Sequence, residues 1–323
     1  MKQTKSILAL VLGAILLLAA VGCTGSGNAA SAEKTYTVGI CQLVQHDALD
    51  AATQGFMDVL KEKLGDKVAF DVKNGSGDPS TCATICNQFV SEEVDLIMAN
   101  ATPAVQAAQA ATNKIPVVGT SVTDYGAALG IDNFGAKTGT NVTGTSDRVP
   151  EEEQAKILQE LFPDAKTLGI LYCSAEANSK VQAAAYGAAA KAMGYTVVEF
   201  TFADSNDLAA VTQTACDECD VIYVPTDNTA ASNAELINNI ANTSKTPILA
   251  GEESICRHCG IATLSISYYE LGRVTGEMAY EILVNGKNPG DMEIRYAPFG
   301  RLYNAANSET VGVAIPDGYE PIV

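Results

Sequence analysis

The sequence predicts an α/β protein with two doubly wound lobes, each built on a parallel sheet that helices cover on both faces. Three observations lead to this prediction. Short apolar runs alternate with helical segments, the alternation restarts after Asp147, and a chain of 323 residues with 47% hydrophobic content is large enough for two cores. Consecutive apolar residues are typical of strands that are buried on both faces.

Eight apolar runs are predicted as strands, and we expect about five parallel strands in each lobe. The runs are VGICQLV (38–44), VAFDV (68–72), VDLIMA (94–99), IPVVGTSV (115–122), LGILY (168–172), TVVEF (196–200), DVIYVP (220–225) and PILA (247–250). Two apolar stripes recur at helical spacing, at Leu49, Phe56, Leu60 and Leu64 and at Leu271, Val274, Met278 and Ile282. We expect both stripes to face the core.

The first 22 residues predict a secretory signal peptide, because Lys2 and Lys5 precede an apolar run over 7–21 that is short for a membrane span. The end of this run, 20–23 (AVGC), resembles the bacterial lipobox, in which the cysteine is lipidated and becomes the mature N-terminus. We therefore expect Cys23 to be lipidated and residues 23–35, rich in Gly, Ser and Ala, to form a flexible tether. An ordinary signal with an incidental cysteine is the alternative. With the lipid, the protein would lie at the outer face of the cytoplasmic membrane.

The charge and the remaining hydropathy limit the kinds of partner. The formal net charge of −18 argues against binding nucleic acid or an anionic surface. No second apolar run approaches the length of a membrane span. We therefore expect the chain after Cys23 to be a soluble body outside the cytoplasm.

Nine cysteines raise the question of disulfides or a metal site. The pair Cys216 and Cys219 precedes one predicted strand, whereas Cys256 and Cys259 follow the next one. In a parallel sheet the two pairs then lie at opposite ends of strands about 17–20 Å long, too far apart to share a metal ion. No metal site is expected, and both local disulfides and free thiols remain open.

Polar residues follow the predicted strands at the positions where a parallel sheet places functional groups, just beyond the carboxyl ends of its strands. Any one of them can serve only as a helix cap, but their convergence from both lobes on one crevice indicates a binding site. The candidates from the first half are Gln42, His46, Thr102, Ser121 and Asp124, and those from the second are Glu176, Asn178, Ser179, Asp227 and Asn228.

The motifs of common enzymes are missing. The sequence has no G-x-S-x-G, no H-E-x-x-H and no glycine-rich loop ending in Gly-Lys-Ser/Thr. The two histidines, His46 and His258, have no nucleophile in evident partnership, although partners need only be near in space. We expect a protein that is not an enzyme and needs no cofactor.

Several short stretches resemble one known family. They are QLVQHDALD (42–50), ATPAVQ (101–106), NVTG (141–144), EANS (176–179) and YELG (269–272), and the resemblance runs from about Tyr36 to about Asn288. As an ordered set they are similar to the TrpX-like substrate-binding lipoproteins of ABC importers, which bind aromatic amino acids. The resemblance implies a type I periplasmic-binding-protein fold, in which two lobes joined by three crossing segments enclose the ligand.

With this fold, the crossings are expected over 141–149, near 252–260, and after Gly286 before the stretch EIRYAP. The N-terminal lobe would comprise 36–145 plus 260–288, and the C-terminal lobe 146–259 plus 289–323. The helix over 268–284 would return to the first lobe.

A zwitterionic amino acid can be enclosed only if both of its charges meet partners. We expect Thr102, Ser121, Asn178 and Ser179, with helix-start N–H groups, to bind the carboxylate. The ammonium would be bound by Asp147, Asp227 or Glu176, of which Asp147 lies on a crossing and would sense closure. Tyr125, which replaces the proline usual in the family, is the candidate for stacking on a ring, because the chain contains no Trp.

The predicted function is that of an extracytoplasmic solute receptor that closes on an aromatic L-amino acid and docks on ABC permease subunits. Two alternatives remain open at this point. The ligand could be a nucleoside or another small ring compound, or the protein could present its ligand to a membrane sensor kinase.

Overall fold

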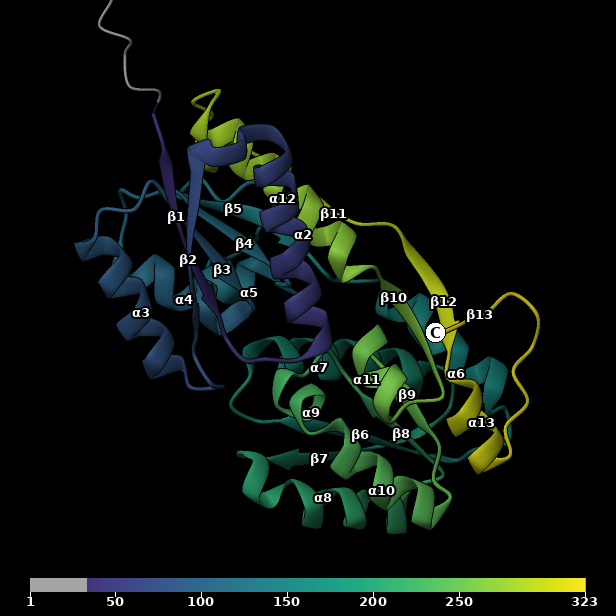
Figure 1. The fold of residues 1–323 in the computed structure, drawn as a ribbon. Coiled ribbons are helices and arrows are strands. Elements are labelled where there is room, and N and C mark those ends of the chain that lie inside the picture. The colour runs from purple at the N-terminus through teal and green to yellow at the C-terminus, as the bar shows by residue number, and fades with distance from the viewer. Residues whose placement is uncertain (1–33, 323) are drawn as a thin grey trace, which may run out of the picture. The chain divides into compact units, whose positions relative to one another are not determined.

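The computed structural model describes residues 34–322 of the chain (Figure 1). The expected signal peptide, Cys23 and most of the expected tether lie outside the described residues. Within 34–322, no helix combines the length and the apolar character that crossing a membrane requires.

The first sheet has six strands, all parallel, in the order β11-β5-β4-β3-β1-β2. The strands are β1 (Tyr36–Gln42), β2 (Val68–Asn74), β3 (Leu96–Asn100), β4 (Val117–Thr120), β5 (Val142–Ser146) and β11 (Arg295–Tyr296). The helices of this lobe are α2 (Asp47–Leu64), α3 (Pro79–Ser91), α4 (Thr102–Ala111), α5 (Tyr125–Leu129) and α12 (Tyr268–Leu283), with short 3₁₀ turns η1 (Gly65–Lys67) and η2 (Pro289–Asp291).

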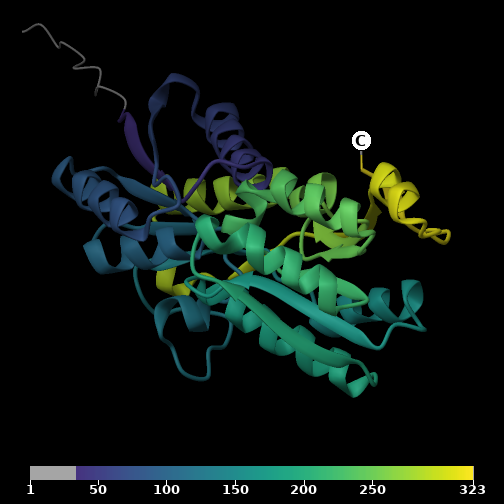
Figure 2. The same cartoon turned by 90° about the horizontal axis from the view of Figure 1, so that it is seen from below.

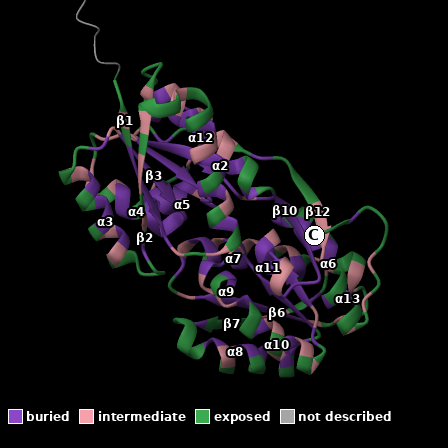
Figure 3. Ribbon diagram, in the orientation of Figure 1, coloured by how far each residue is buried: buried purple, intermediate pink, exposed green. Residues whose placement is uncertain are grey.

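Alternate residues of these strands point to opposite faces of the sheet, and their side chains pack into two separate hydrophobic cores. Leu96 and Met98 of β3 pack with Phe56 of α2 and Met278 of α12, whereas Ile97 and Ala99 pack with α3, α4 and α5. Helices therefore cover both faces of the sheet, which is why the strands read as continuous apolar runs. Figure 3 shows the buried strands between outward-facing exposed helix surfaces.

The second sheet has seven strands in the order β13-β12-β10-β9-β8-β6-β7. The strands are β6 (Thr167–Cys173), β7 (Thr196–Phe202), β8 (Val221–Val224), β9 (Ile248–Ala250), β10 (Ala262–Ile266), β12 (Phe299–Tyr303) and β13 (Glu320–Pro321). The helices are α6 (Glu151–Leu161), α7 (Ala177–Ala192), α8 (Ser205–Glu218), α9 (Asn228–Ser232), α10 (Ala234–Ser244), α11 (Glu253–His258) and α13 (Ala305–Val311). The predicted strands of this lobe pair in parallel, and β12, which was not among them, runs antiparallel to β10.

All eight predicted strands form, with ends that differ from the predicted ones by a few residues. Strand β5 lies within the expected first crossing, 141–149, and although its sequence, VTGTS, is polar, all five of its residues are buried. Its hydroxyls are satisfied inside the lobe: Thr145 Oγ1 lies 2.8 Å from Thr275 Oγ1 and 3.2 Å from Thr120 Oγ1.

Three segments join the lobes, and two of them differ in position from the expectation. The first follows β5 and begins at Asp147, the second is Ser267 between β10 and α12, and the third is 297–298 between β11 and β12. Strand β10 pairs with β9, so the expected start of the returning segment at residue 260 is about seven residues too early. Strand β11 pairs with β5, so the first lobe extends beyond the expected boundary at 289.

Helices α2 and α12 pack with their backbones in close approach (Figure 1, Figure 2). A β-carbon at Gly272 would lie 2.0 Å from the carbonyl oxygen of Ala52, and one at Gly55 would lie 2.1 Å from the carbonyl oxygen of Tyr269. The helix that returns from the second lobe is thereby held on the first lobe by shape. Gly272 is the last residue of the YELG stretch noted in the sequence.

The eight cysteines of the described part of the chain are all buried and free. Cys216 and Cys219 lie at the end of α8 and Cys256 and Cys259 at α11, and all four belong to one buried cluster of the second lobe. Among residues 34–322, no three His, Cys, Asp or Glu side chains are arranged to hold a metal ion.

We predict that Gly272→Ala destabilises the protein by about 1–3 kcal/mol, because the added methyl group must push the two helix backbones apart. Chemical denaturation monitored by circular dichroism measures this. Gly300→Ala is the matched control, since no atom lies within 4 Å of a β-carbon built there. Equal stabilities for the two variants would contradict the role assigned to Gly272.

Candidate ligand-binding site

A narrow cavity lies between the lobes. The first lobe contributes His46, Leu49, Ser121 and Thr123, the second contributes Asn178, Thr226, Asp227, Asn228, Ala231 and Glu252, and the segments at the crossings contribute Asp147 and Tyr268. The free space for water inside is about 10 Å³, which is room for about one molecule. In this arrangement the lobes are closed, and a larger ligand requires them to move apart.

The first lobe presents hydrogen-bond donors from two strained strand ends. Ala101 and Ser121, which follow β3 and β4, have φ values of +88° and +55°, a region that residues other than glycine rarely adopt. No side chain among the described residues caps α4, and because Pro103 has no N–H, the first-turn N–H groups without an acceptor in the helix are those of Thr102 and Ala104. The hydroxyls of Thr102 and Ser121 are buried without a partner among the described residues.

Asp147 occupies the first crossing and is buried, with 5% of its surface exposed. Its Oδ2 accepts a hydrogen bond of 3.0 Å from the hydroxyl of Tyr268, and its Oδ1 has no partner among residues 34–322. Burial raises the pKa of Asp147 to about 6, although the hydroxyls of Tyr268 and Thr123 act in the opposite direction. The carboxylate therefore lacks a compensating charge at the centre of the molecule.

Two further acids of the cavity carry raised pKa values. Burial raises the pKa of Glu252 to about 8, even though its carboxylate accepts the backbone N–H groups of Ser254 and Ile255 at the start of α11. The pKa of Asp227 is raised to about 8 by burial and by the nearby charge of Glu176. Both carboxyls are therefore mainly protonated at neutral pH, which limits the negative charge that the cavity holds.

Glu176 is buried beside the cavity and accepts hydrogen bonds from five donors. Its Oε1 accepts the N–H and the hydroxyl of Thr229, and its Oε2 accepts the side-chain amide of Asn178 and both the N–H and the side-chain amide of Asn228. These bonds tie the start of α7 to the start of α9. With both oxygens occupied, this carboxylate organises its neighbours rather than facing the cavity.

The two lobes also meet directly at the mouth of the cavity. His46 Nε2 lies 3.3 Å from Asn228 Oδ1, and His258 Nε2 lies 3.0 Å from Asp47 Oδ2. Burial lowers the pKa of His46, against the influence of Asn228 and the neighbouring acids. The imidazole of His46 is therefore neutral at neutral pH, and it bridges the first lobe to the second.

Four cavity residues carry a buried polar atom with no partner among the described residues. The atoms are His46 Nδ1, Ser121 Oγ, Asp147 Oδ1 and Asn178 Oδ1. An unpaired buried polar group costs about 1–3 kcal/mol, so four in one small cavity require a compensating partner. A polar ligand that contacts both lobes and the crossing supplies such a partner.

Six of the twelve predicted site residues line this cavity: His46, Ser121, Asp147, Asn178, Asp227 and Asn228. Thr102 lies beside it at the start of α4. Gln42 and Ser179 point to other partners: the amide of Gln42 bonds to Asp50 and Thr53, and the hydroxyl of Ser179 donates to Asp227.

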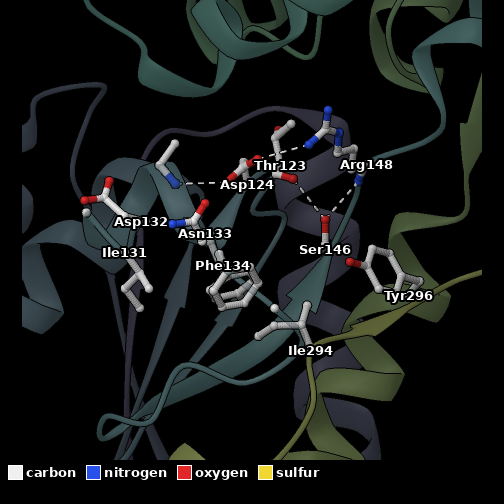
Figure 4. A pocket seen from close by; sticks show the side chains of 15 residues that line it. Thr123, Asp124, Ile131, Asp132, Asn133, Phe134, Ser146, Arg148, Ile294 and Tyr296 are labelled. Atoms are coloured by element: carbon white, nitrogen blue, oxygen red, sulfur yellow. Dashed lines mark hydrogen bonds and ion pairs between the residues drawn. The ribbon is translucent and has the colours of Figure 1, made fainter.

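The prediction that Tyr125 stacks on a ligand in this cavity is not supported by its position. Tyr125 is 2% exposed, its hydroxyl donates to the Thr145 carbonyl oxygen at 3.1 Å, and its ring stacks on Phe134. It belongs to the core of the first lobe, beside a separate open groove of about 600 Å³ (Figure 4). Asp124 lies at the same groove, where it caps α5 and pairs with Arg148 at 3.0 Å.

Six residues of the cavity were not among the predicted site residues: Leu49, Thr123, Thr226, Ala231, Glu252 and Tyr268. Glu252 follows the predicted strand over 247–250 at the same position as the other candidates, so the strand-end rule could have found it. Tyr268 follows β10, which had not been predicted as a strand. Leu49 and Ala231 are apolar and carry no signal that separates them from core residues.

Comparisons with known proteins agree with this architecture. Residues 37–318 match the family described as ABC transporter substrate binding protein. A tyrosine-binding protein of Clostridioides difficile is 37% identical over 306 residues, which cover 91% of this chain and 88% of that protein.

Two solved structures share the fold. One is the ABC domain from Streptococcus pneumonia in complex with L-Trp, at 32% identity and a TM-score of 0.85, covering 90% of this chain and all of that one. The other is the ligand-free, open form of a substrate-binding protein with adhesive properties from Clostridium difficile, at 36% identity and a TM-score of 0.68, covering 89% of this chain and 99% of that one. The chain belongs to the substrate-binding proteins of ABC transporters.

Proposed function

We propose that this chain binds a free aromatic amino acid, L-tyrosine or L-tryptophan, in the cavity between its lobes and delivers it to an ABC importer. The four unpaired polar atoms of the cavity carry the proposal, because they come from both lobes and from the crossing. Two relatives above 30% identity, the tyrosine-binding protein and the ABC domain in complex with L-Trp, support this class of ligand.

The charges of a zwitterion match the two sides of the cavity. The carboxylate would be bound by the hydroxyls of Ser121 and Thr102 and by the first-turn N–H groups of α4, where the helix dipole favours an anion. The ammonium would be bound by Asp147. The ring would pack on Leu49, Ala231 and the ring of Tyr268, the apolar and aromatic surfaces of the cavity.

Closure of the lobes is the event that we expect ligand binding to drive. The present structure has a TM-score of 0.85 to the L-Trp complex and 0.68 to the open, ligand-free relative, although the open relative is slightly more similar in sequence. A rotation of two rigid lobes lowers the score of a whole chain without altering either lobe. The comparison therefore supports two arrangements that differ in lobe closure.

We further propose that the chain is exported and held at the outer face of the cytoplasmic membrane by a lipid on Cys23. The residues at 20–23 support this proposal through their likeness to a lipobox. A tether of this kind keeps the receptor near its permease and raises the effective concentration for docking.

We predict that the full-length protein binds L-tyrosine or L-tryptophan with micromolar or tighter affinity and becomes more compact on binding. Calorimetry measures the affinity, and small-angle scattering measures the change in radius of gyration. Adenosine serves as the test of the nucleoside alternative. Binding of adenosine with no heat from Tyr, Trp or Phe would reject the proposal.

We predict that Asp147→Asn weakens binding of the amino acid by about 2–5 kcal/mol, because the ammonium loses the buried charge that pairs with it. The unliganded variant should be at least as stable as the original protein, since an isolated buried charge is removed. Asp204→Asn is the matched control: Asp204 caps α8 far from the cavity, and Asn caps a helix equally well.

The pH dependence of binding follows from the same group. The pKa of Asp147 is raised from the ordinary value of 3.8 to about 6, so its ionised form costs stability in full above pH 6, and this cost is lost progressively as the pH falls from 6 to 3.8. Ligand binding has the opposite sign because the ammonium requires the carboxylate. Below pH 6 the Kd should rise about tenfold per pH unit. Asp227 and Glu252, with pKa values of about 8, stay protonated over this range.

Calorimetric titrations between pH 5 and 7 measure this dependence. In the Asp147→Asn variant the Kd should stay constant over the same range. A Kd of the original protein that does not change between pH 7 and 5 would show that Asp147 does not hold the ammonium.

We predict that Cys23→Ala moves the protein from the membrane fraction to the soluble fraction of its host cell, because the residue that receives the lipid is lost. Fractionation followed by immunoblotting measures the distribution, and mass spectrometry of the N-terminus identifies the lipid. Cys41→Ala, at a buried cysteine inside the first lobe, is the control. An unchanged distribution would reject the anchor.

A further inference from the structure

We infer that Glu176 is a positioning residue that turns hydrogen-bond acceptors toward the cavity, so that the site recognises a primary ammonium group. The inference rests on the proposed function and assigns to Glu176 a role different from direct contact with the ligand. It follows from the hydrogen bonds of three side chains: Asn178, Asn228 and His46.

The amide of Asn178 has one possible orientation. Its Nδ2 lies 3.1 Å from Glu176 Oε2 and 2.8 Å from the carbonyl oxygen of Thr226, and both of these atoms are acceptors only. Turning the amide over would place its oxygen against these two oxygens. Asn178 Oδ1 therefore faces away from Glu176, and it is one of the unpaired buried atoms of the cavity.

Asn228 is oriented by the same carboxylate, and it determines the tautomer of His46. Asn228 Nδ2 donates to Glu176 Oε2 at 2.7 Å, so Asn228 Oδ1 is the atom that faces His46 Nε2 at 3.3 Å. The proton of the neutral imidazole must then lie on Nε2. His46 Nδ1 is left as a lone pair, and it too is buried and unpaired at the cavity.

The cavity therefore presents three acceptors from three parts of the fold. Asn178 Oδ1 comes from the second lobe, His46 Nδ1 from the first, and Asp147 Oδ1 from the crossing. A primary ammonium carries three N–H donors and one positive charge, which matches three acceptors of which one is ionised. The charge of Glu176 is distributed over its five donors, so Asp147 supplies the charge that pairs with the ligand.

The experiment uses three ligands and the full-length protein. L-tyrosine has both the ammonium and the ring hydroxyl, 3-(4-hydroxyphenyl)propanoate lacks the ammonium, and L-phenylalanine lacks the hydroxyl. The variants are Glu176→Gln, Asn178→Ala and the double substitution. Glu199→Gln is the matched control, because Glu199 accepts a hydrogen bond from Tyr172 and does not line the cavity.

Glutamine at 176 keeps the size of the side chain but replaces one acceptor oxygen with an N–H donor, so the five donors can no longer all be satisfied. We expect Glu176→Gln and Asn178→Ala each to weaken L-tyrosine binding about tenfold or more. Binding of 3-(4-hydroxyphenyl)propanoate should stay within about twofold, and the ratio of L-tyrosine to L-phenylalanine affinity should not change. The double variant should bind L-tyrosine more weakly than Asn178→Ala but by less than the product of the two single effects, since Glu176 acts through Asn178 and, by way of Asn228, through His46.

The tautomer of the His46 imidazole can be measured directly. If Glu176 only stabilised the fold, replacing it with glutamine would not change this tautomer. The chain has only two histidines, so nuclear magnetic resonance of labelled imidazoles can assign them. We expect a proton on Nε2 of His46 in the original protein and a shift toward the other tautomer in Glu176→Gln. A proton on Nδ1 of His46 in the original protein would overturn the inference.

The remaining outcomes separate the inference from the proposed function. If the original protein binds neither L-tryptophan nor any of the three ligands, the proposed function fails and the inference fails with it. A second outcome is that the original protein binds L-tyrosine while Asn178→Ala loses the preference for L-tyrosine over L-phenylalanine and still requires the ammonium. In that case Asn178 contacts the ring hydroxyl of the ligand, and the inference alone is wrong. If Glu176→Gln does not fold, Asn178→Ala must still lose the preference for the ammonium.

Discussion

The cost of burying a charge without a partner is the constraint on which the rest of this structure depends. Asp147 lies on the segment that joins the lobes, in a cavity that closure shuts off from water. While the cavity holds no cation, closing the lobes removes this carboxylate from solvent without compensation. A ligand that brings the opposite charge makes closure favourable, so binding and closure become one event. A ligand shifts the equilibrium only by its differential affinity for the closed state.

The two sheets bring the necessary groups to this point because the carboxyl ends of parallel strands gather at one edge. In the first lobe, β3 and β4 end in the strained residues Ala101 and Ser121, which leads the chain past the cavity. In the second lobe, helices α7 and α9 begin beside the cavity and are tied together by Glu176. The strained backbone at Ala101 and Ser121 in the first lobe, and the five hydrogen bonds of the Glu176 carboxylate in the second, hold polar atoms in place before the ligand binds.

The division of acids within and beside the cavity has a physical logic. Glu176 is surrounded by five donors, Asp227 and Glu252 bond to helix N-termini and have raised pKa values, and only Asp147 keeps an oxygen without a partner. Four neighbouring carboxylates in full ionisation would repel one another strongly at low dielectric. The observed arrangement reduces this repulsion and leaves one charge for the ligand. Ligand recognition therefore depends on the acceptor atoms of the cavity that have no hydrogen-bond partner among the described residues.

The two lobes and the eight principal strands could be predicted from the sequence, because these features depend on local hydrophobic pattern. The return of the last long helix to the first lobe was implied by the family resemblance. The cavity-lining residues His46, Ser121, Asn178, Asp227 and Asn228 were candidates because a polar residue after a buried strand has a fixed place in a parallel sheet, and Asp147 was a candidate because it lies on an expected crossing. The tertiary structure alone decided that polar β5 is a central strand, because its threonines find partners on distant segments. It also decided that Tyr125 packs in the core and that Glu176 faces donors instead of the ligand. The reason is the same in each case: the partner of a buried polar or aromatic group lies on another segment, and its distance along the chain carries no information about its distance in space.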